Sequence, residues 1–153
     1  MFSKKVYEFM FAALQEAEVA FDEDEVPVGA VITYQDKIIG KGHNQIEKLK
    51  DPTAHAEMIA ITSAANYLGD WRLNECDLYV TLEPCIMCTG AILSSRIHNL
   101  YFATFDSKLG ACGSVYSLIK ENKYNHTLNI FSGIYEKESK DLLEKFFRKL
   151  RKN

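Results

Sequence analysis

Two short segments of the 153-residue chain carry side chains that can bind a metal ion and transfer protons. His55 and Glu57 lie in the first segment, and Cys85 and Cys88 lie three positions apart in the second. One imidazole and two thiolates are ligands that zinc binds well, and zinc in proteins takes four ligands. Three protein ligands leave one position for water, and zinc lowers the pKa of that water to near neutrality. Glu57 is then placed to move protons and not to bind the metal.

Both segments are expected at the start of a helix, which favours the charged forms that a metal site needs. A Cys-x-x-Cys pair in a first helical turn has both sulfurs on one face, because positions three apart are neighbours. The N-terminus of a helix stabilises negative charge, so both thiols should ionise readily. Pro84 directly precedes the pair and suits a first helical turn. The backbone N–H groups around Pro84 and Cys85 are therefore candidates for stabilising negative charge on a reacting substrate.

The four cysteines admit other interpretations. Two disulfides are disfavoured, because the chain is long, is 47% apolar and has no signal-peptide pattern in residues 1–10. Cys76 and Cys112 stand alone and are expected to be small buried residues. A Cys-x-x-Cys pair after a strand is by itself also typical of a thioredoxin-like redox centre. His-x-Glu at one helix start together with Pro-Cys-x-x-Cys at the next favours zinc.

Composition and charge predict one soluble domain over residues 1–153. No apolar run approaches the roughly 20 residues that span a bilayer, so no membrane partner is expected and a cytoplasmic location is predicted. The net charge of −3 argues against a polyanionic partner for the chain as a whole. Five basic and no acidic residues lie between positions 145 and 152, however, and such a segment can bind phosphates. The alternative is a solvated helix end, where basic residues are common.

The spacing of apolar residues predicts an alternation of helices and strands. Helices are predicted over residues 4–21, 54–67, 85–94, 114–121 and 136–151. Strands are predicted over residues 28–34, 37–43, 77–82, 97–104 and 128–131. The first two strands should form a hairpin through Gln35 and Asp36. This order favours an α/β fold with a mixed five-stranded sheet and helices on both faces.

The sequence resembles the bacterial tRNA-specific adenosine deaminase family over residues 6–148. The pattern His-x-Glu…Pro-Cys-x-x-Cys is a known signature of zinc-dependent nucleobase deaminases. The matching stretches are PVGAV (27–31), GHN (42–44), DPTAHAE (51–57), LYVTLEPCIMC (78–88), GAILSSRI (90–97), FDSKLGACGS (105–114) and FFRKLR (146–151). The motifs DPTAHAE and EPCxMC are shared with guanine deaminases. The SRI motif, the DxKxGAxGS motif and the C-terminal FFR are more particular to the tRNA enzymes.

The resemblance implies the three-layer α/β/α fold of the cytidine-deaminase superfamily and hydrolytic deamination of adenosine to inosine. The implied substrate is the wobble adenosine of a tRNA anticodon stem-loop, in an arginine tRNA, turned out of its stack into the zinc pocket. One Zn²⁺ per subunit and a homodimer with active sites near the subunit interface are implied as well.

The resemblance also assigns roles to residues outside the metal site. Asn44 is expected to hydrogen-bond the flipped nucleoside, and Asp106 to contact the sugar-phosphate region near it. Phe146, Phe147 and Arg148 are expected to hold the anticodon loop. Each has a structural alternative: Asn44 as a turn residue closing a strand, Asp106 as a cap for Ser107 or Lys108, and the two phenylalanines as core residues.

Two rival functions remain open from the sequence. A free-base deaminase acting on guanine or cytosine would share the zinc chemistry, and the basic tail and the FFR motif favour RNA over it. A catalytically silent zinc-bearing subunit that binds RNA is disfavoured, because such a subunit has no chemical use for Glu57. The chain departs from many relatives at Gln45, where they carry a basic residue, and over residues 121–126, which are hard to align.

Overall fold

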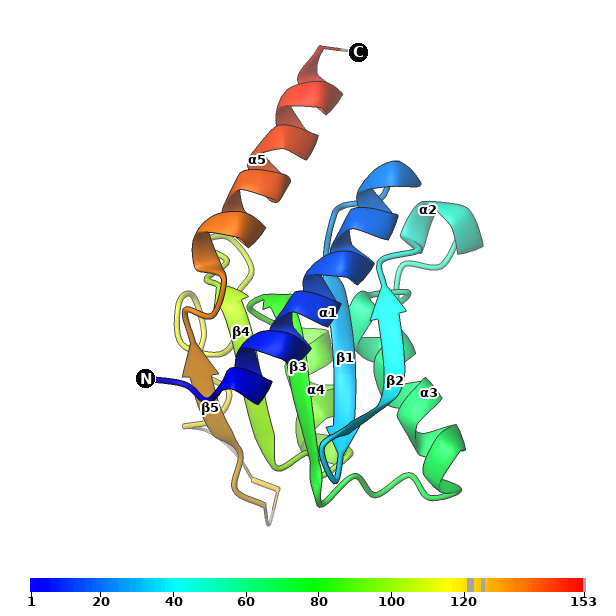
Figure 1. Cartoon of the computed structure of the whole chain (residues 1–153), viewed down its shortest axis with the longest axis vertical. Coiled ribbons are helices and arrows are strands. Elements are labelled where there is room, and N and C mark those ends of the chain that lie inside the picture. Colours follow the sequence, from blue (N-terminus) through cyan, green and yellow to red (C-terminus); the bar gives the residue numbers. More distant parts are fainter. Residues whose placement is uncertain (121–122, 125, 153) are drawn as a thin grey trace.

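Five strands form one mixed sheet in the computed structural model, which describes residues 1–120, 123–124 and 126–152 (Figure 1). The strands are β1 (Gly29–Tyr34), β2 (Lys37–His43), β3 (Cys76–Leu82), β4 (Asn99–Thr104) and β5 (Asn129–Ser132). Their order across the sheet is β2-β1-β3-β4-β5. Strand β1 runs antiparallel to both of its neighbours, whereas β3, β4 and β5 are parallel. Strands β2, β3 and β4 therefore all point toward the same edge of the sheet.

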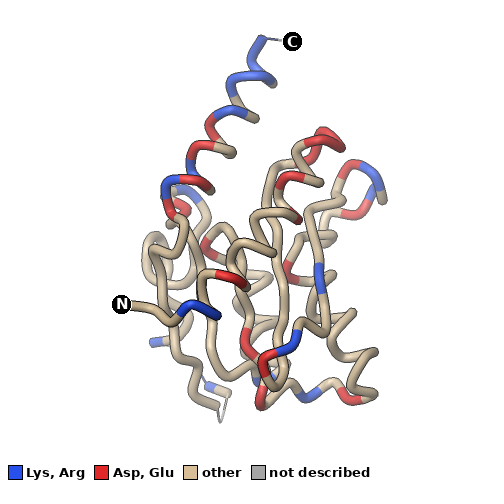
Figure 2. Tube along the Cα trace, viewed as in Figure 1, with Lys and Arg blue, Asp and Glu red and all other residues tan. Residues whose placement is uncertain are grey.

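Helices cover both faces of this sheet, which confirms the expected three-layer arrangement. They are α1 (Lys4–Asp22), α2 (Ile46–Leu49), α3 (Ala56–Leu68), α4 (Ile86–Ser94) and α5 (Glu136–Arg151). Helix α1 crosses one face, α3 and α4 lie on the other, and α5 extends beyond the edge of the sheet (Figure 1). The acidic end of α1 and the basic end of α5 both lie beyond that edge (Figure 2). None of the described helices combines the length and the apolar character needed to cross a membrane.

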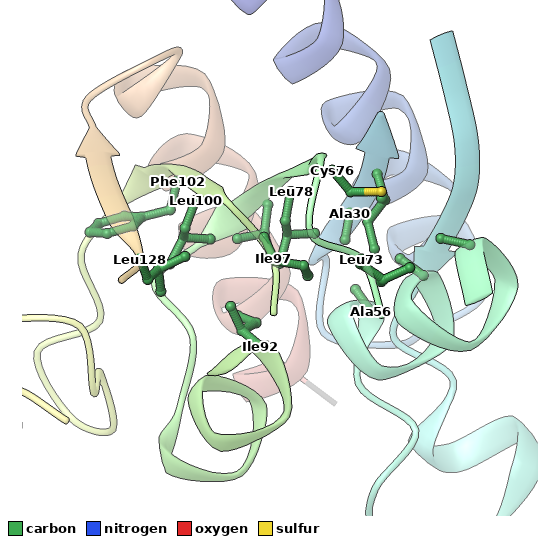
Figure 3. Close-up of a cluster of buried hydrophobic side chains, with 14 of the residues drawn as sticks. Ala30, Ala56, Leu73, Cys76, Leu78, Ile92, Ile97, Leu100, Phe102 and Leu128 are labelled. Atoms are coloured by element: carbon green, nitrogen blue, oxygen red, sulfur yellow. The ribbon is translucent and has the colours of Figure 1, made fainter. Parts of the chain in front are cut away.

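The pleat of the strands divides the core into two layers. Ala30, Ile32, Leu78 and Val80 point toward α3 and α4, where they pack in the larger cluster shown in Figure 3. The alternate residues of the same strands point the other way: Val31 and Tyr79 pack against Val6, Met10 and Ala13 of α1. Successive side chains of a strand face opposite sides, so strands buried on both faces read as continuous apolar runs. The sheet is thus a rigid platform between two helical layers.

The predicted elements agree with the observed ones to within two residues, apart from two corrections. The hairpin is confirmed, and Gln35 and Asp36 both adopt the positive φ that a two-residue turn of this kind requires. The helix predicted over residues 114–121 is wrong for 114–120, which form turns and a bridge between Cys112 and Ser117, and residue 121 lies outside the described residues. Side-chain contacts from elsewhere in the chain shape this segment, as described below.

The short helix α2 was not predicted from the sequence. Its first two free N–H groups, those of Glu47 and Lys48, donate to the carboxylate of Glu25, at 3.0 and 2.8 Å. Glu25 is buried and lies more than twenty residues earlier in the chain. A carboxylate that arrives through tertiary packing supplies the cap that a helix start needs. No local pattern within residues 46–49 records that contact.

Glycines in β2 allow α3 to lie directly against the sheet. A Cβ atom on Gly42 would lie 2.3 Å from the carbonyl oxygen of Ala56, and one on Gly40 would lie 2.7 Å from that of Ala60. Only a residue without a side chain tolerates such close approach of two backbones. Because Ala56 is the first residue of α3, the contact at Gly42 sets where that helix begins.

Replacing Gly42 by alanine should therefore destabilise the fold. We expect Gly42→Ala to lower the free energy of unfolding by about 1–3 kcal/mol, the usual cost of overpacking a well-packed site. Gly90→Ala is the matched control, because a Cβ there meets nothing within 4 Å. Gly90 lies inside α4, so the control should gain about 0.5–1 kcal/mol. Urea unfolding measures both, and equal midpoints for Gly42→Ala and the parent chain would contradict the packing argument.

Candidate functional site

Three potential metal ligands from two helices meet at the edge of the sheet to which β2, β3 and β4 point. His55 is the N-cap residue of α3, Cys85 is the N-cap residue of α4, and Cys88 lies in the first turn of α4. One ligand atom of each lies within 4.8 Å of the other two. Nδ1 of His55 is 3.4 Å from Sγ of Cys88 and 3.7 Å from Sγ of Cys85.

These separations fit a tetrahedral zinc ion. With Zn–N near 2.0 Å and Zn–S near 2.3 Å, ligand nitrogen and sulfur atoms lie about 3.6 Å apart across a tetrahedral angle. The measured separations lie close to that value. No further His, Cys, Asp or Glu joins the group among the described residues. The donor set therefore matches a zinc site with three protein ligands, the number found in catalytic centres.

The sheet topology explains why residues thirty positions apart meet. Helix α3 begins after β2, α4 begins directly after β3, and residues 105–114 follow β4. In open α/β sheets, binding sites form outside the carboxyl ends of the strands, where such connections meet. The N-termini of α3 and α4 both point into this site and contribute partial positive charge there. The location therefore favours thiolates and negatively charged reacting groups.

Proton sharing among the ligands favours cation binding. The hydrogen bond from Cys88 is the main cause that lowers the pKa of the Cys85 thiol, to about 4, and contact with His55 lowers it further. The same contact raises the pKa of Cys88, because its proton is held by the Cys85 sulfur. The pKa of His55 is raised, chiefly by its hydrogen bond with Cys85. A divalent cation would take the place of the protons that these three groups share.

Glu57 lies beside the metal ligands and is buried. It occupies the second position of α3 and is 4% exposed. Burial disfavours its charged form and raises its pKa to about 7, although the nearby His55 acts in the opposite direction. A carboxyl group with a pKa near the working pH is suited to general acid–base catalysis. This geometry agrees with the proton-transfer role expected for Glu57.

A cavity of about 490 Å³ opens above the metal ligands. His55, Glu57 and Cys85 form one part of its lining. The remainder is largely apolar and comes from distant parts of the chain: Val26, Val28, Ile46, Leu82, Leu109 and Leu143. This volume lies in the usual range for small-molecule sites. Ile46 and Leu143 were not predicted as site residues, because their side chains are typical of any core.

Asn44 and Asp106 both line this cavity, and each also accepts a structural hydrogen bond from the backbone; for Asp106 this includes the expected contact with Lys108. Oδ1 of Asn44 accepts a hydrogen bond from the backbone N–H of Ala56 at 2.8 Å, which fixes the start of α3. Oδ1 of Asp106 accepts from the N–H groups of Lys108 and Leu109, at 3.0 and 3.2 Å. Each side chain therefore has one polar atom held by the backbone. Their contacts with substrate stay predictions.

The three candidate residues of α5 lie in different environments. Phe146 is 6% exposed, packs against Phe21 with ring centroids 6.1 Å apart, and does not line the cavity. Its position is that of a core residue, and its RNA contact stays a prediction. Phe147 is 41% exposed and lines the cavity. Arg148 lines a neighbouring groove instead.

This second groove is the larger of the two spaces, at about 760 Å³. It shares Phe105, Ser107, Lys108 and Phe147 with the cavity, so the two are adjacent. Four basic side chains line it, Lys108, Lys140, Arg148 and Arg151, against two acidic ones, Glu136 and Glu144. Lys108 and Lys140 were not predicted as binding residues, although Lys108 belongs to the DxKxGAxGS motif. A polyanion lying in this groove would reach the metal site directly.

A hydrogen bond near the start of helix α5 holds this helix beside the cavity and the groove. The hydroxyl of Ser139 donates to the carbonyl oxygen of Thr81 in β3, at 2.5 Å. Positions four apart share one helix face, so Leu143 and Phe147 follow Ser139 toward the cavity.

Pro84, which directly precedes the N-cap residue of α4, has no backbone N–H. Of the two residues predicted to donate backbone hydrogen bonds to substrate, only Cys85 can do so, and that role stays a prediction.

Comparisons with known proteins give the same picture. The sequence profile of the cytidine and deoxycytidylate deaminase zinc-binding region matches residues 3–104. The tRNA-specific adenosine deaminase of Aquifex aeolicus is 48% identical over 145 residues, which cover 95% of each chain. A solved structure from studies of A-to-I editing by tRNA:A34 deaminases at the wobble position of transfer RNA has a TM-score of 0.85 and 42% identity. It covers 88% of this chain and 98% of its own. The guanine deaminase of Bacillus subtilis has a TM-score of 0.64 and 32% identity, over 81% of this chain and 82% of its own.

Loss of one thiol should remove the metal. We expect Cys88→Ala to weaken zinc binding by at least about 100-fold. Mutating a residue that only hydrogen-bonds a metal ligand already costs about 10–100-fold in metal affinity, and loss of the ligand itself should cost at least as much. Cys76→Ala is the matched control, because Cys76 is also buried but lies outside the metal group. Zinc content after dialysis, measured by mass spectrometry, distinguishes the two. A Cys88→Ala protein that keeps as much zinc as the control would exclude Cys88 as a ligand.

Proposed function

Because the chain belongs to the tRNA-specific adenosine deaminase family, we propose that it converts adenosine to inosine at the wobble position of a tRNA anticodon. One observation carries the proposal. His55, Cys85 and the buried Glu57 line one cavity, Cys88 completes the metal group beside them, and a basic groove borders the cavity. The cavity suits the reacting base and the groove suits the RNA backbone. We propose an arginine tRNA as the substrate and, for a tRNA-modifying enzyme, a cytoplasmic location.

The reaction adds water to C6 of adenine and releases the amino group as ammonia. Zinc held by His55, Cys85 and Cys88 would supply an acidified water molecule and positive charge beside the reacting carbon. Glu57 accepts the proton of the attacking water and delivers it to N1 of the purine. It then helps to transfer a proton to the departing amino group. Burial lets this carboxyl group take up and release protons near neutral pH.

The surrounding residues bind and orient the nucleotide. Asn44, with Oδ1 held by the backbone, directs its amide nitrogen toward the base. Asp106 binds near the sugar and phosphate, and Cys85 offers its N–H to developing negative charge. Phe105 and Phe147 are 50% and 41% exposed at the mouth of the cavity. Exposed aromatic rings stack on bases that have left their own stack, which is how single-stranded RNA is commonly held.

The basic groove accounts for the choice of RNA over a free base. A free base carries no phosphate, so Lys108, Lys140, Arg148 and Arg151 would have no role in binding it.

From the family resemblance we also propose one zinc ion per chain and a homodimer with active sites near the subunit interface.

The assignment of substrate is tested by a direct comparison. The purified protein is incubated separately with an arginine tRNA carrying an ACG anticodon and with guanine. We expect inosine at the wobble position of the tRNA, with one ammonia released per inosine, and no ammonia from guanine. Nucleoside analysis and an ammonia assay measure the two products. Deamination of guanine with intact tRNA would replace the proposal by its rival.

Glu57 is tested by the isosteric replacement Glu57→Gln. Removing a general acid–base group typically costs about 10²–10⁴-fold in rate, and we expect a loss of kcat in that range on the tRNA substrate. Zinc content and the urea unfolding midpoint should stay at the parental values, because Glu57 is not a metal ligand in the proposal. The assignment fails if the variant loses its zinc, or if it retains more than a tenth of the parental kcat.

A further inference from the structure

Glu83 is a buried carboxylate that the mechanism above does not use. It follows β3 directly and is 2% exposed. The metal-ligand candidate Cys85 lies two positions further along the chain, after Pro84. Taking a carboxylate out of water is costly unless donors replace the lost solvent. The question is which donors those are.

Within the described part of the chain, the donors to the Glu83 carboxylate all come from residues 105–114, which we call the rim loop. Oε1 accepts from the N–H of Asp106 at 3.0 Å and from the hydroxyl of Ser114 at 2.6 Å. Oε2 accepts from the N–H groups of Cys112 and Ser114, at 2.9 and 3.1 Å. Each oxygen thus receives two donors. The rim loop replaces the water that the carboxylate has lost.

The rim loop is also shaped to fit this side chain. A Cβ atom on Gly110 would lie 2.2 Å from Oε1 of Glu83 and 2.3 Å from the hydroxyl oxygen of Ser114. Any larger residue at position 110 would have to displace the carboxylate of Glu83 and the hydroxyl of Ser114 from each other. The N–H of Ala111 donates to the carbonyl oxygen of Pro84 at 2.9 Å, which adds a second attachment to the same strand end. The loop is therefore held at both of its ends by residues that directly precede Cys85.

The rim loop lines both spaces of the proposed site. Phe105, Ser107 and Lys108 line the cavity and the basic groove alike, and Asp106 and Leu109 line the cavity. The positions of these residues relative to the metal ligands depend on the attachment of the loop to β3. Binding residues keep a fixed geometry when neighbouring side chains hold them in place through packing and hydrogen bonds.

We propose that Glu83 is a positioning residue that holds the rim loop beside the metal site and thereby determines how tightly the RNA substrate binds. The inference rests on the proposed function for the identity of the substrate. Glu83 also lines the cavity, but both of its oxygens are engaged by the rim loop, so in this proposal it acts through the loop. Its loss should accordingly weaken RNA binding more than it slows the chemical step.

The replacement Glu83→Gln tests the requirement for two acceptor oxygens. With its NH₂ group in the place of Oε2, the amide would face the N–H groups of Cys112 and Ser114, and two hydrogen bonds would be lost. In the place of Oε1 it would face the N–H of Asp106, whereas the hydroxyl of Ser114 can turn to accept from it, so one would be lost. We expect KM for an anticodon stem-loop RNA to rise about tenfold or more, the effect of losing at least one hydrogen bond to a charged group. We expect kcat to stay within about threefold and zinc content to be unchanged.

A pair of serine variants tests the contact from the side of the loop. Ser114→Ala removes one donor to Glu83 and leaves the residues next to Cys85 intact, so KM should rise by about threefold, the smaller effect of one lost hydrogen bond. Ser117→Ala is the matched control. Ser117 lies three residues beyond the rim loop and bridges to Cys112 through its backbone, and it is not among the described donors to Glu83. The control should keep the parental KM.

Amide hydrogen exchange provides a readout that does not depend on activity. In Glu83→Gln the amides of Asp106, Cys112 and Ser114 should exchange about tenfold faster, while those of β3 stay protected. The proposal is supported if this local exchange accompanies a rise in KM. Unchanged exchange overturns it, and so does a joint loss of kcat and zinc, which would show that Glu83 supports the metal site itself. If the parental protein does not deaminate RNA, the proposed function fails, and the exchange experiment still decides whether Glu83 holds the loop.

Discussion

The convergence of three strand ends at one edge of the sheet is the constraint on which the site depends. Strands β2, β3 and β4 point the same way, and the segments that follow them bring together His55, Cys85 and the rim loop. The helices α3 and α4 begin there, so their partial positive charges add beside the thiols. Close backbone packing at Gly42 holds the first of these helices in place. A metal site, a proton carrier and a substrate cavity all follow from that one meeting point.

Three buried carboxylates near this edge have different tasks because their hydrogen-bond partners differ. Glu25 accepts two backbone N–H groups and caps α2. Glu83 accepts four donors and holds the rim loop. Glu57 is hydrogen-bonded by its own backbone N–H and by the Cys88 side chain, and its burial raises its pKa to about 7. A carboxylate saturated with donors supports structure, whereas one that is buried with few donors can exchange protons with a substrate.

The distribution of charge explains how a chain of net charge −3 can bind RNA. The acidic end of α1 and the basic end of α5 extend in the same direction from the sheet (Figure 2). Asp24, just after α1, pairs with Lys149 at 3.3 Å, and the ring of Phe21 lies beneath Lys145 and Lys149. These lysines are thus engaged locally. Lys108, Lys140, Arg148 and Arg151 line the groove instead. Positive charge is concentrated beside the cavity, which directs a polyanion to the metal site.

The elements and the metal chemistry could be read from the sequence because both are recorded locally. Apolar periodicity located the five strands and four of the five observed helices, each with both ends within two residues. Residue type and spacing indicated His55, Cys85 and Cys88 as zinc ligands. Periodicity could not distinguish Phe146 from Phe147, since adjacent positions of α5 differ only in what packs against them: Phe21 covers the first, and the second faces the cavity.

The wrong prediction of a helix over residues 114–121 and the failure to predict helix α2 have the same cause. Glu83 shapes one segment and Glu25 caps the other, and each carboxylate comes from more than twenty residues away. Local pattern decides which elements form, whereas contacts between distant segments decide which side chains are buried, capped or turned toward the site.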